Sequence, residues 1–210
     1  MKKKEKKTIV EGVIKFDFKC LDDSFIIKPR FYQKVDKYRQ LLKLHDYIGQ
    51  YPNGISYGNI SMRRGKSKHF IISASDTGKI IDTTAVHYVE IIHCDISENT
   101  CYYKGAGLPS SEALSHFILY NYSPEINAVI HLHNKELWKK LLYKVPTSSP
   151  EVEYGTQEMV EEIRRLLERT DLMKEKILVM GGHEDGIICF GESLTEAWDI
   201  LMTYTAITKK

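Results

Sequence analysis

The sequence predicts a three-layer α/β/α sandwich with a central, largely antiparallel sheet. Helical and strand periodicities both occur along the 210 residues, and short turn-like segments join most of the strand candidates, which favours antiparallel pairing. No repeat, low-complexity tract or linker rich in proline and glycine divides the chain. A hydrophobic content of 42% is enough to fill a sizeable core. We therefore expect one globular domain in which helices cover the sheet.

The chain opens with a basic tail, MKKKEKK, followed by a first strand candidate. A short tail of this kind is typical of a solvated chain end rather than a nucleic-acid-binding arm. Apolar residues from Ile14 to Cys20 then alternate with charged residues, which is the pattern of a half-buried strand. Because no apolar segment resembles a signal peptide or spans a bilayer, we expect a cytoplasmic protein without membrane contact.

Further segments have strand character because they combine apolar, β-branched and aromatic residues between turn signals. They are HFIISAS (69–75), VEIIHCD (89–95), CYYKG (101–105), NAVIHLH (127–133), KILVMGG (176–182) and GIICFG (186–191).

Helical periodicity marks the segments between these strands. It covers residues 31–49, Ser111 to about Tyr122, Lys135 to Tyr143, Gln157 to Glu168, and Leu194 toward the C-terminus. The last helix has the clearest start, because Ser193 and Glu196 form an S-x-x-E capping box.

The charges nearly cancel, with 30 Lys and Arg against 28 Asp and Glu. This balance gives no overall field that would attract nucleic acid or an acidic membrane surface. The partner is therefore expected at a local site, as a small-molecule substrate.

The four cysteines, Cys20, Cys94, Cys101 and Cys189, contain no CxxC pair, so they indicate neither a zinc ribbon nor a redox motif. Cys94 and Cys101 flank a turn-like segment, and a disulfide between them across a hairpin is possible on geometry. A cytoplasmic location favours buried, free thiols instead.

Three histidines form a candidate metal site. His131 and His133 lie two residues apart in a predicted strand, so their side chains leave the same face and can converge on one ion. An isolated H-x-H pair is more often simply part of a core. His183 adds a third candidate, because it follows an apolar strand and the flexible Gly181 and Gly182. Three imidazoles leave a coordination position open, as catalytic zinc sites do.

A helix start in GLPSSEALSH offers Glu112 beside the hydroxyls of Ser110 and Ser111. A first-turn acid is commonly only a partner of the helix dipole. The same helix start can also hold a phosphate through backbone N–H groups. His116, one turn after Glu112, is assigned a structural role. Two small-residue turns are expected to add amide donors to this cradle, at Gly58, Asn59, Thr77 and Gly78.

Taken in order, several of these motifs resemble the class II aldolase/adducin family. They are GNIS, SDTG, PSSE, HLH after an apolar strand, YGTQEM opening a helix, and GGH before a glycine and another strand, and they run from about Leu41 to Ile207. The ordered combination is much more specific than any single member. The resemblance makes residues 31–210 the family domain and residues 1–30 an N-terminal extension with the basic tail and one strand.

The resemblance implies an α/β/α fold that assembles as a homotetramer and binds a divalent metal, most simply Zn²⁺. Position by position, it assigns the metal to His131, His133 and His183, and acid/base catalysis to Glu112. It assigns binding of the substrate phosphate to Gly58, Asn59, Thr77, Gly78, Ser110 and Ser111.

The implied function is that of a lyase, an aldolase that cleaves a phosphorylated ketose through a metal-stabilised enediolate. Alternatives on the same scaffold are a dehydratase, a decarboxylase, a 4-epimerase of a sugar phosphate, or a non-enzymatic adducin-like module. Related epimerases typically carry Asp where this chain has Glu112, and adducin-like relatives lack the metal histidines, so both features favour the aldolase. The segment from Asn134 to Glu153 is shorter than in fuculose-phosphate aldolases, which leaves Tyr154 and Tyr204 as possible substitutes for catalytic tyrosines.

Overall fold

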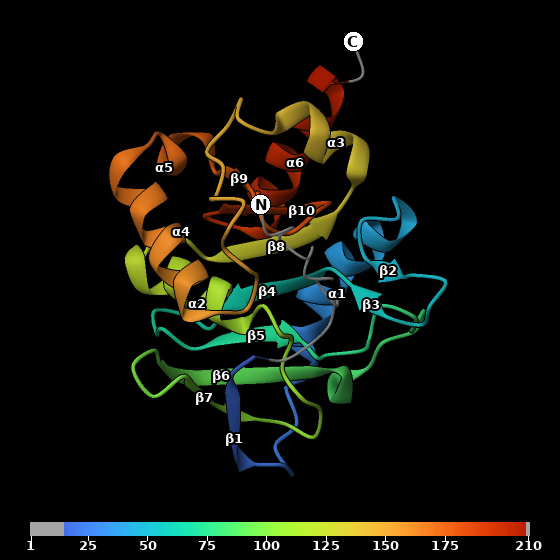
Figure 1. Cartoon of the computed structure of the whole chain (residues 1–210). Coiled ribbons are helices and arrows are strands. Elements are labelled where there is room, and N and C mark those ends of the chain that lie inside the picture. Colours follow the sequence, from blue (N-terminus) through green and yellow to red (C-terminus); the bar gives the residue numbers. More distant parts are fainter. Residues whose placement is uncertain (1–14, 209–210) are drawn as a thin grey trace.

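A computed structural model describes residues 15–208, so the basic tail lies outside the described residues. Its centre is an eight-stranded sheet in the order β1-β7-β6-β5-β4-β8-β10-β9, beside a two-stranded sheet of β2 and β3 (Figure 1). The strands are β1 (Asp17–Asp22), β2 (Gly49–Gln50), β3 (Ser56–Tyr57), β4 (Asn59–Arg63), β5 (Phe70–Ser73), β6 (Tyr88–Asp95), β7 (Thr100–Lys104), β8 (Ala128–His133), β9 (Ile177–Val179) and β10 (Gly186–Gly191).

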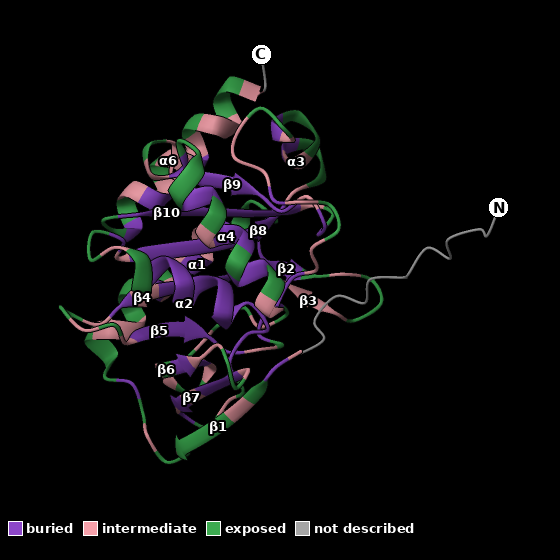
Figure 2. Ribbon diagram, turned by 60° about the vertical axis from the view of Figure 1, so that its left-hand side comes forward, coloured by how far each residue is buried: buried purple, intermediate pink, exposed green. Residues whose placement is uncertain are grey.

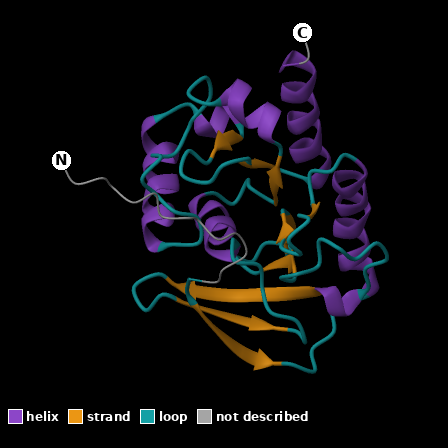
Figure 3. Cartoon of the chain, turned by 45° about the vertical axis from the view of Figure 1, so that its right-hand side comes forward, coloured by secondary structure: helices purple, strands orange, loops and turns teal. Residues whose placement is uncertain are grey.

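Helices lie on both sides of the sheet, which forms the middle of three layers (Figure 3). The helices are α1 (Pro29–Leu44), α2 (Ala113–Tyr122), α3 (Lys135–Leu141), α4 (Gln157–Arg169), α5 (Leu172–Glu175) and α6 (Leu194–Thr208), with a 3₁₀ turn at Ala85–His87. Helix α1 ends before residue 49, its predicted end, because Asp46 adopts a left-handed conformation with φ of 56°.

Antiparallel pairing joins all the neighbouring strands of the large sheet except β1, which runs parallel to β7 at the edge. The predicted α/β/α fold with a largely antiparallel sheet is therefore confirmed. The register of β8 positions the site, because Asn59 of β4 lies opposite His131 and Gly186 of β10 lies opposite His133.

Two hydrophobic cores fill the spaces between the layers. Side chains alternate across each strand, so Val129 packs under α2 and α4, while Ile130 and Leu132 pack under α1, α3 and α6. Figure 2 shows the central strands buried and the edge strand β1 largely exposed. Burial on both faces explains why the inner strands have nearly continuous apolar sequences.

The sequence does not predict strand β4, because YGNIS has the composition of a small-residue turn. The turn is confined to Gly58, whose φ is 73°, and Asn59 is already the first residue of β4. The segment is difficult to recognise because it is short and is followed directly by a polar, basic stretch.

The expectation of four free thiols is wrong for Cys94 and Cys101, which form a disulfide between β6 and β7. These strands form a hairpin whose register places the two cysteines directly opposite each other, 4.0 Å apart at their Cα atoms. Of the remaining cysteines, Cys189 is buried as expected, but Cys20 is exposed on the edge strand.

The predicted capping box at the start of α6 is present in altered form. The Ser193 hydroxyl accepts a hydrogen bond from the backbone N–H of Glu196, as expected. The Glu196 carboxylate, however, accepts from the N–H of Glu192, one residue before the cap, and from the Lys176 ammonium. No helix within residues 15–208 is long and apolar enough to cross a membrane.

Arg63, at the end of β4, connects the sheet to the C-terminal end of α2. Its guanidinium donates to the carbonyl oxygens of Tyr120, Ser123, Ile126 and Ser67 at 2.6–3.0 Å. The side chain is almost completely buried. One charged donor therefore binds carbonyl groups of the helix end, of the turn that follows it and of the β4–β5 connection.

We expect Arg63→Met to lower the free energy of unfolding by about 2–3 kcal/mol, because these carbonyl groups lose a charged donor. Urea denaturation followed by circular dichroism measures the change. Arg164→Met is the control, because Arg164 pairs with Glu161 on the surface of α4 and its loss should change stability by less than about 0.5 kcal/mol. Equal effects of the two substitutions would contradict this role of Arg63.

Candidate metal centre and active site

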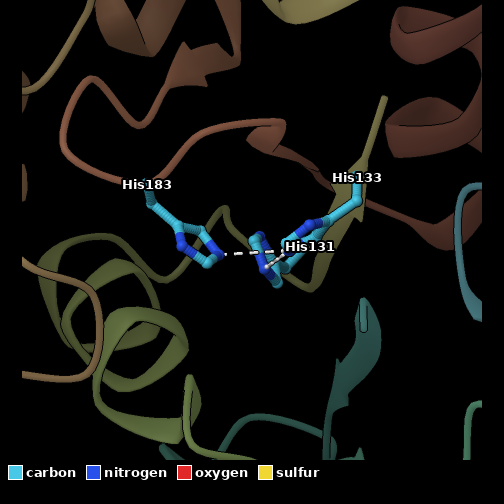
Figure 4. A group of neighbouring side chains, drawn as sticks. All are labelled: His131, His133 and His183. Carbon is cyan, nitrogen blue, oxygen red and sulfur yellow. Dashed lines mark hydrogen bonds between the residues drawn. The ribbon is translucent and has the colours of Figure 1, made fainter. Parts of the chain in front are cut away.

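His131, His133 and His183 bring their rings together at one point beside the sheet (Figure 4). The first two project from the same face of β8, and the third comes from the loop between β9 and β10. The Nε2 atom of His133 lies 3.0 Å from that of His131 and 3.1 Å from that of His183. Three ring nitrogens this close to one another fit a single ion that binds each of them at about 2.0–2.1 Å.

Hydrogen bonds on the opposite ring nitrogens orient two of these imidazoles. The Nδ1–H of His131 donates to the carbonyl oxygen of Ile187, 3.2 Å away, which leaves the Nε2 lone pair directed toward the other rings. The Nδ1 atom of His133 shares a hydrogen bond of 2.8 Å with the Tyr51 hydroxyl. Outer partners of this kind are typical of metal-binding histidines.

All three rings are buried and therefore favour the neutral form. Desolvation lowers the pKa of His131 to about 4, although the bond to the Ile187 carbonyl acts in the opposite direction. Desolvation also lowers the pKa values of His133 and His183 well below the usual range, and the neighbouring rings add to the effect. Near neutral pH the site thus presents uncharged imidazoles, the form that binds metals.

The glycines before His183 allow close packing rather than an unusual turn. Neither has a positive φ. A Cβ atom on Gly181 would lie 2.2 Å from the carbonyl oxygen of Ser148, and one on Gly182 would lie 2.1 Å from that of Val152. The predicted need for glycine holds, but its cause is the approach of the 144–155 segment, which brings His183 to the metal centre.

Glu112 lies directly before α2 and is 2% exposed. Its Oε2 atom accepts a hydrogen bond of 2.7 Å from the Ser115 hydroxyl, one turn further along the helix. A carboxylate at this position is stabilised by the helix dipole. The side chain is thus held in a dry environment by a residue of its own helix.

One pocket contains Glu112, His131 and every residue expected to bind phosphate. Its lining includes Gly58, Asn59, Thr77, Gly78, Ser110 and Ser111. The Asn59 amide donates to the Ser110 hydroxyl, 2.8 Å away, which connects the start of β4 to the start of α2. Segments far apart in the sequence therefore meet at one small polar cavity, although the individual roles of these residues remain predictions.

The tyrosines near the metal centre could not be identified by spacing. Tyr154 is fully buried and packs against His183, with ring centroids 4.5 Å apart. Tyr57 packs against His133 at 5.4 Å, on the same side as Tyr51. Tyr204 instead donates to Glu175 at the C-terminal end of the molecule, away from this pocket.

His116 has the structural environment that was expected, although its partner lies outside α2. Its Nδ1 atom shares a hydrogen bond of 2.7 Å with the Ser61 hydroxyl on β4. Ser61 in turn bonds to the Tyr120 hydroxyl, also at 2.7 Å. These buried contacts join α2 to the sheet beside the metal centre.

Known structures share this arrangement of helices and strands. An L-fuculose 1-phosphate aldolase superposes with a TM-score of 0.67 at 21% identity, covering 89% of this chain and 86% of the other. The L-fuculose-1-phosphate aldolase from Thermus thermophilus gives 0.63 at 18% identity, covering 87% and 92%. A sugar-phosphate aldolase from Thermotoga maritima gives 0.60 at 17% identity, covering 82% and 89%. At these identities the likeness establishes a common fold.

The sequence itself matches a family. Among curated proteins, none matches the chain. The family model described as Class II Aldolase and Adducin N-terminal domain, however, matches residues 52–209, which contain the three histidines, Glu112 and the whole pocket described above. The chain therefore belongs to the class II aldolase and adducin family.

Proposed function

We propose that the protein is a metal-dependent aldolase that cleaves a carbon–carbon bond of a phosphorylated ketose. The observation that carries this proposal is that His131 of the three-histidine cluster lines the same cavity as Glu112 and the polar turns. An electrophile, a proton carrier and a set of anion-binding donors are the components that such a cleavage requires.

The residues present fit a divalent ion, with Zn²⁺ as the proposed metal. His131, His133 and His183 would hold it through their Nε2 atoms, which converge and are buried in neutral form. When bound, the ion supplies electrophilic stabilisation of the negative charge that develops at the carbonyl as the carbon–carbon bond breaks. Tyr51 and the Ile187 carbonyl fix the orientation of two of the rings.

Glu112 is the proposed proton carrier. Its carboxylate is buried, and the Ser115 hydroxyl holds one of its oxygen atoms. In this environment water does not compete for the proton, and the carboxylate can deliver one to, or remove one from, carbon at a fixed position. Cleavage leaves a carbanion equivalent that must be protonated, and this step is the role assigned to Glu112.

The substrate phosphate is proposed to bind between the turn at Gly58, the turn at Thr77 and Gly78, and the start of α2. This region presents the hydroxyls of Ser110 and Ser111 in front of a helix N-terminus. Helix N-termini and small-residue turns bind phosphate through backbone N–H groups.

Two features of the sequence favour an aldolase over the other functions that occur on this fold. Glu112 stands where related epimerases typically have Asp, and the chain retains all three histidines, unlike adducin-like modules. We further propose, by the same resemblance, a cytoplasmic enzyme of carbohydrate metabolism that assembles as a homotetramer.

The Glu112→Gln variant tests the proton carrier. The amide keeps the size of the side chain but cannot exchange a proton, so exchange of solvent deuterium into a ketose phosphate should fall by about 10²–10⁴-fold. Metal content and fold should be unchanged. Proton NMR in D₂O measures the exchange. Glu158→Gln, in the first turn of α4, is the matched control; unchanged exchange in the Glu112 variant would exclude this role.

The His131→Ala and His183→Ala variants test the metal ligands. Each should weaken metal binding by more than about a hundredfold, since even the loss of an outer partner costs 10–100-fold. Plasma mass spectrometry after dialysis against a chelator measures the metal per chain. His69→Ala, which removes a half-buried histidine beside Glu90, should have no effect. Full occupancy in the His131 variant would show that the ligand set is wrong.

The pH dependence of metal retention follows from the lowered pKa values. Because burial lowers the pKa of His131 to about 4, protons compete for its Nε2 atom only in acid, well below the ordinary value of about 6.5. The protein should therefore keep its metal at pH 5.5 and lose it only as the pH falls through about 4. Metal analysis across this range is the measurement, and half-loss near pH 6.5 would contradict the buried, neutral state of the ligands.

A further inference from the structure

The proposed phosphate site has no cation on its surface. Among the described residues that line the pocket, the only ionisable carboxylates are Asp76 and Glu112, and there is no lysine or arginine. Asp76 is already paired with Lys79, an exposed side chain. A phosphate group carries nearly two negative charges at neutral pH. Neutral hydroxyl and amide donors alone would leave most of that charge uncompensated.

Two cations of α1 lie directly behind this site. The Nη2 atom of Arg39 donates to the carbonyl oxygens of Thr77 and Ile80, at 2.5 Å and 3.0 Å. The Lys43 ammonium donates to the carbonyl oxygen of Gly78 at 2.5 Å. Thr77 and Gly78 line the pocket, so one layer of backbone separates both positive charges from the space where an anion would bind.

Arg39 differs from an arginine that serves only as a structural connector. Its side chain is completely buried, yet its Nε and Nη1 atoms have no hydrogen-bond partner among the described residues. Its acidic neighbour on α1, Asp36, attracts the guanidinium electrostatically, but its carboxylate accepts a hydrogen bond from the Tyr88 hydroxyl rather than from Arg39. Arg63, by contrast, uses all three guanidinium nitrogens on carbonyl groups. A buried guanidinium that is only half satisfied is costly unless another charge compensates it.

The buried Arg39 guanidinium also affects the protonation of Lys43. Desolvation and then the nearby Arg39 guanidinium lower the pKa of the Lys43 ammonium. Asp46 acts in the opposite direction on Lys43, but its effect is smaller than that of Arg39. A dianion in the adjacent pocket would further offset the repulsion between the two cations.

The same contacts determine the direction of the donors in the turn. In a trans peptide the C=O and the following N–H point in opposite directions, and no cis peptide occurs in the described chain. Because Arg39 holds the Thr77 carbonyl toward α1, the N–H of Gly78 points away from α1. Lys43 holds the Gly78 carbonyl in the same way, so the N–H of Lys79 also points away from α1.

We propose that Arg39, assisted by Lys43, is a positioning residue that makes this pocket specific for a phosphorylated ligand. Arg39 supplies the positive charge that the lining lacks, and the two cations together turn the backbone N–H groups of Gly78 and Lys79 away from α1, toward the phosphate. The inference rests on the proposed function in its assignment of the pocket to the substrate phosphate. It identifies residues in the helix behind the pocket that select a dianion.

The experiment compares binding of inorganic phosphate and of dihydroxyacetone phosphate with binding of dihydroxyacetone, using the metal-loaded full chain and isothermal titration calorimetry. Arg39→Met and Lys43→Met should each weaken binding of both phosphates by about tenfold or more, as expected for loss of a charge-assisted interaction. Affinity for dihydroxyacetone should stay unchanged. Arg39→Lys should recover part of the loss, because it restores the charge without the guanidinium.

The matched control is Arg63→Met, which also removes a buried arginine but leaves phosphate affinity at the wild-type value. If Arg39→Met does not fold, Lys43→Met still tests whether the cations of α1 are needed for phosphate binding. Wild-type phosphate affinity in the folded variants, or equal losses for dihydroxyacetone, would overturn the inference. Cleavage of a phosphorylated ketose by the wild type, together with unchanged phosphate affinity in both variants, would leave the proposed function intact. Loss of phosphate affinity in the variants, with no cleavage of any ketose phosphate by the wild type, would support the role of Arg39 and contradict the proposed aldolase activity.

Discussion

The pairing of β8 with β4 on one side and β10 on the other is the constraint on which the rest of this structure depends. Alternation along β8 directs its small and aliphatic residues into both cores, while His131 and His133 emerge on the side of α2. A register shift of one residue would move both imidazoles to the opposite core. The two hydrophobic cores that hold β8 in register therefore also hold the candidate metal ligands.

Buried polar groups are tolerated around this strand because neighbouring elements provide partners for them. The rings of His131 and His133 bond to the Ile187 carbonyl and the Tyr51 hydroxyl, and Ser115 holds Glu112. Each partner comes from a segment that is itself fixed by the sheet or by a helix. The pocket thus needs little rearrangement to present its donors to a ligand, which is the condition for electrostatic stabilisation of a reacting group.

Much of the fold and of the candidate metal centre could be predicted from the sequence because the informative patterns are local. The spacing of His131 and His133 depends only on strand alternation, and the apolar runs of β6, β8 and β10 are long enough to recognise. Strand β4 was not recognised because it is short and begins in a turn-like sequence, and its pairing with the distant strand β8 leaves no local pattern.

The features that the sequence does not reveal depend on contacts between distant segments. Cys94 and Cys101 form a disulfide only because the hairpin register places them opposite each other. Tyr51 and Arg39 have no motif, and their relevance comes from His133 and Thr77, the residues they contact. Family resemblance did not indicate either residue.

Product analysis of the metal-loaded wild-type protein tests the central claim most directly. Phosphorylated ketoses of different lengths and configurations would be incubated with the protein and followed by carbon and phosphorus NMR. The account predicts that one of them is split into a three-carbon ketone phosphate and an aldehyde, with no reaction in the metal-free protein. Recovery of the intact sugar with one inverted centre, or tight metal binding without conversion of any substrate, would contradict it.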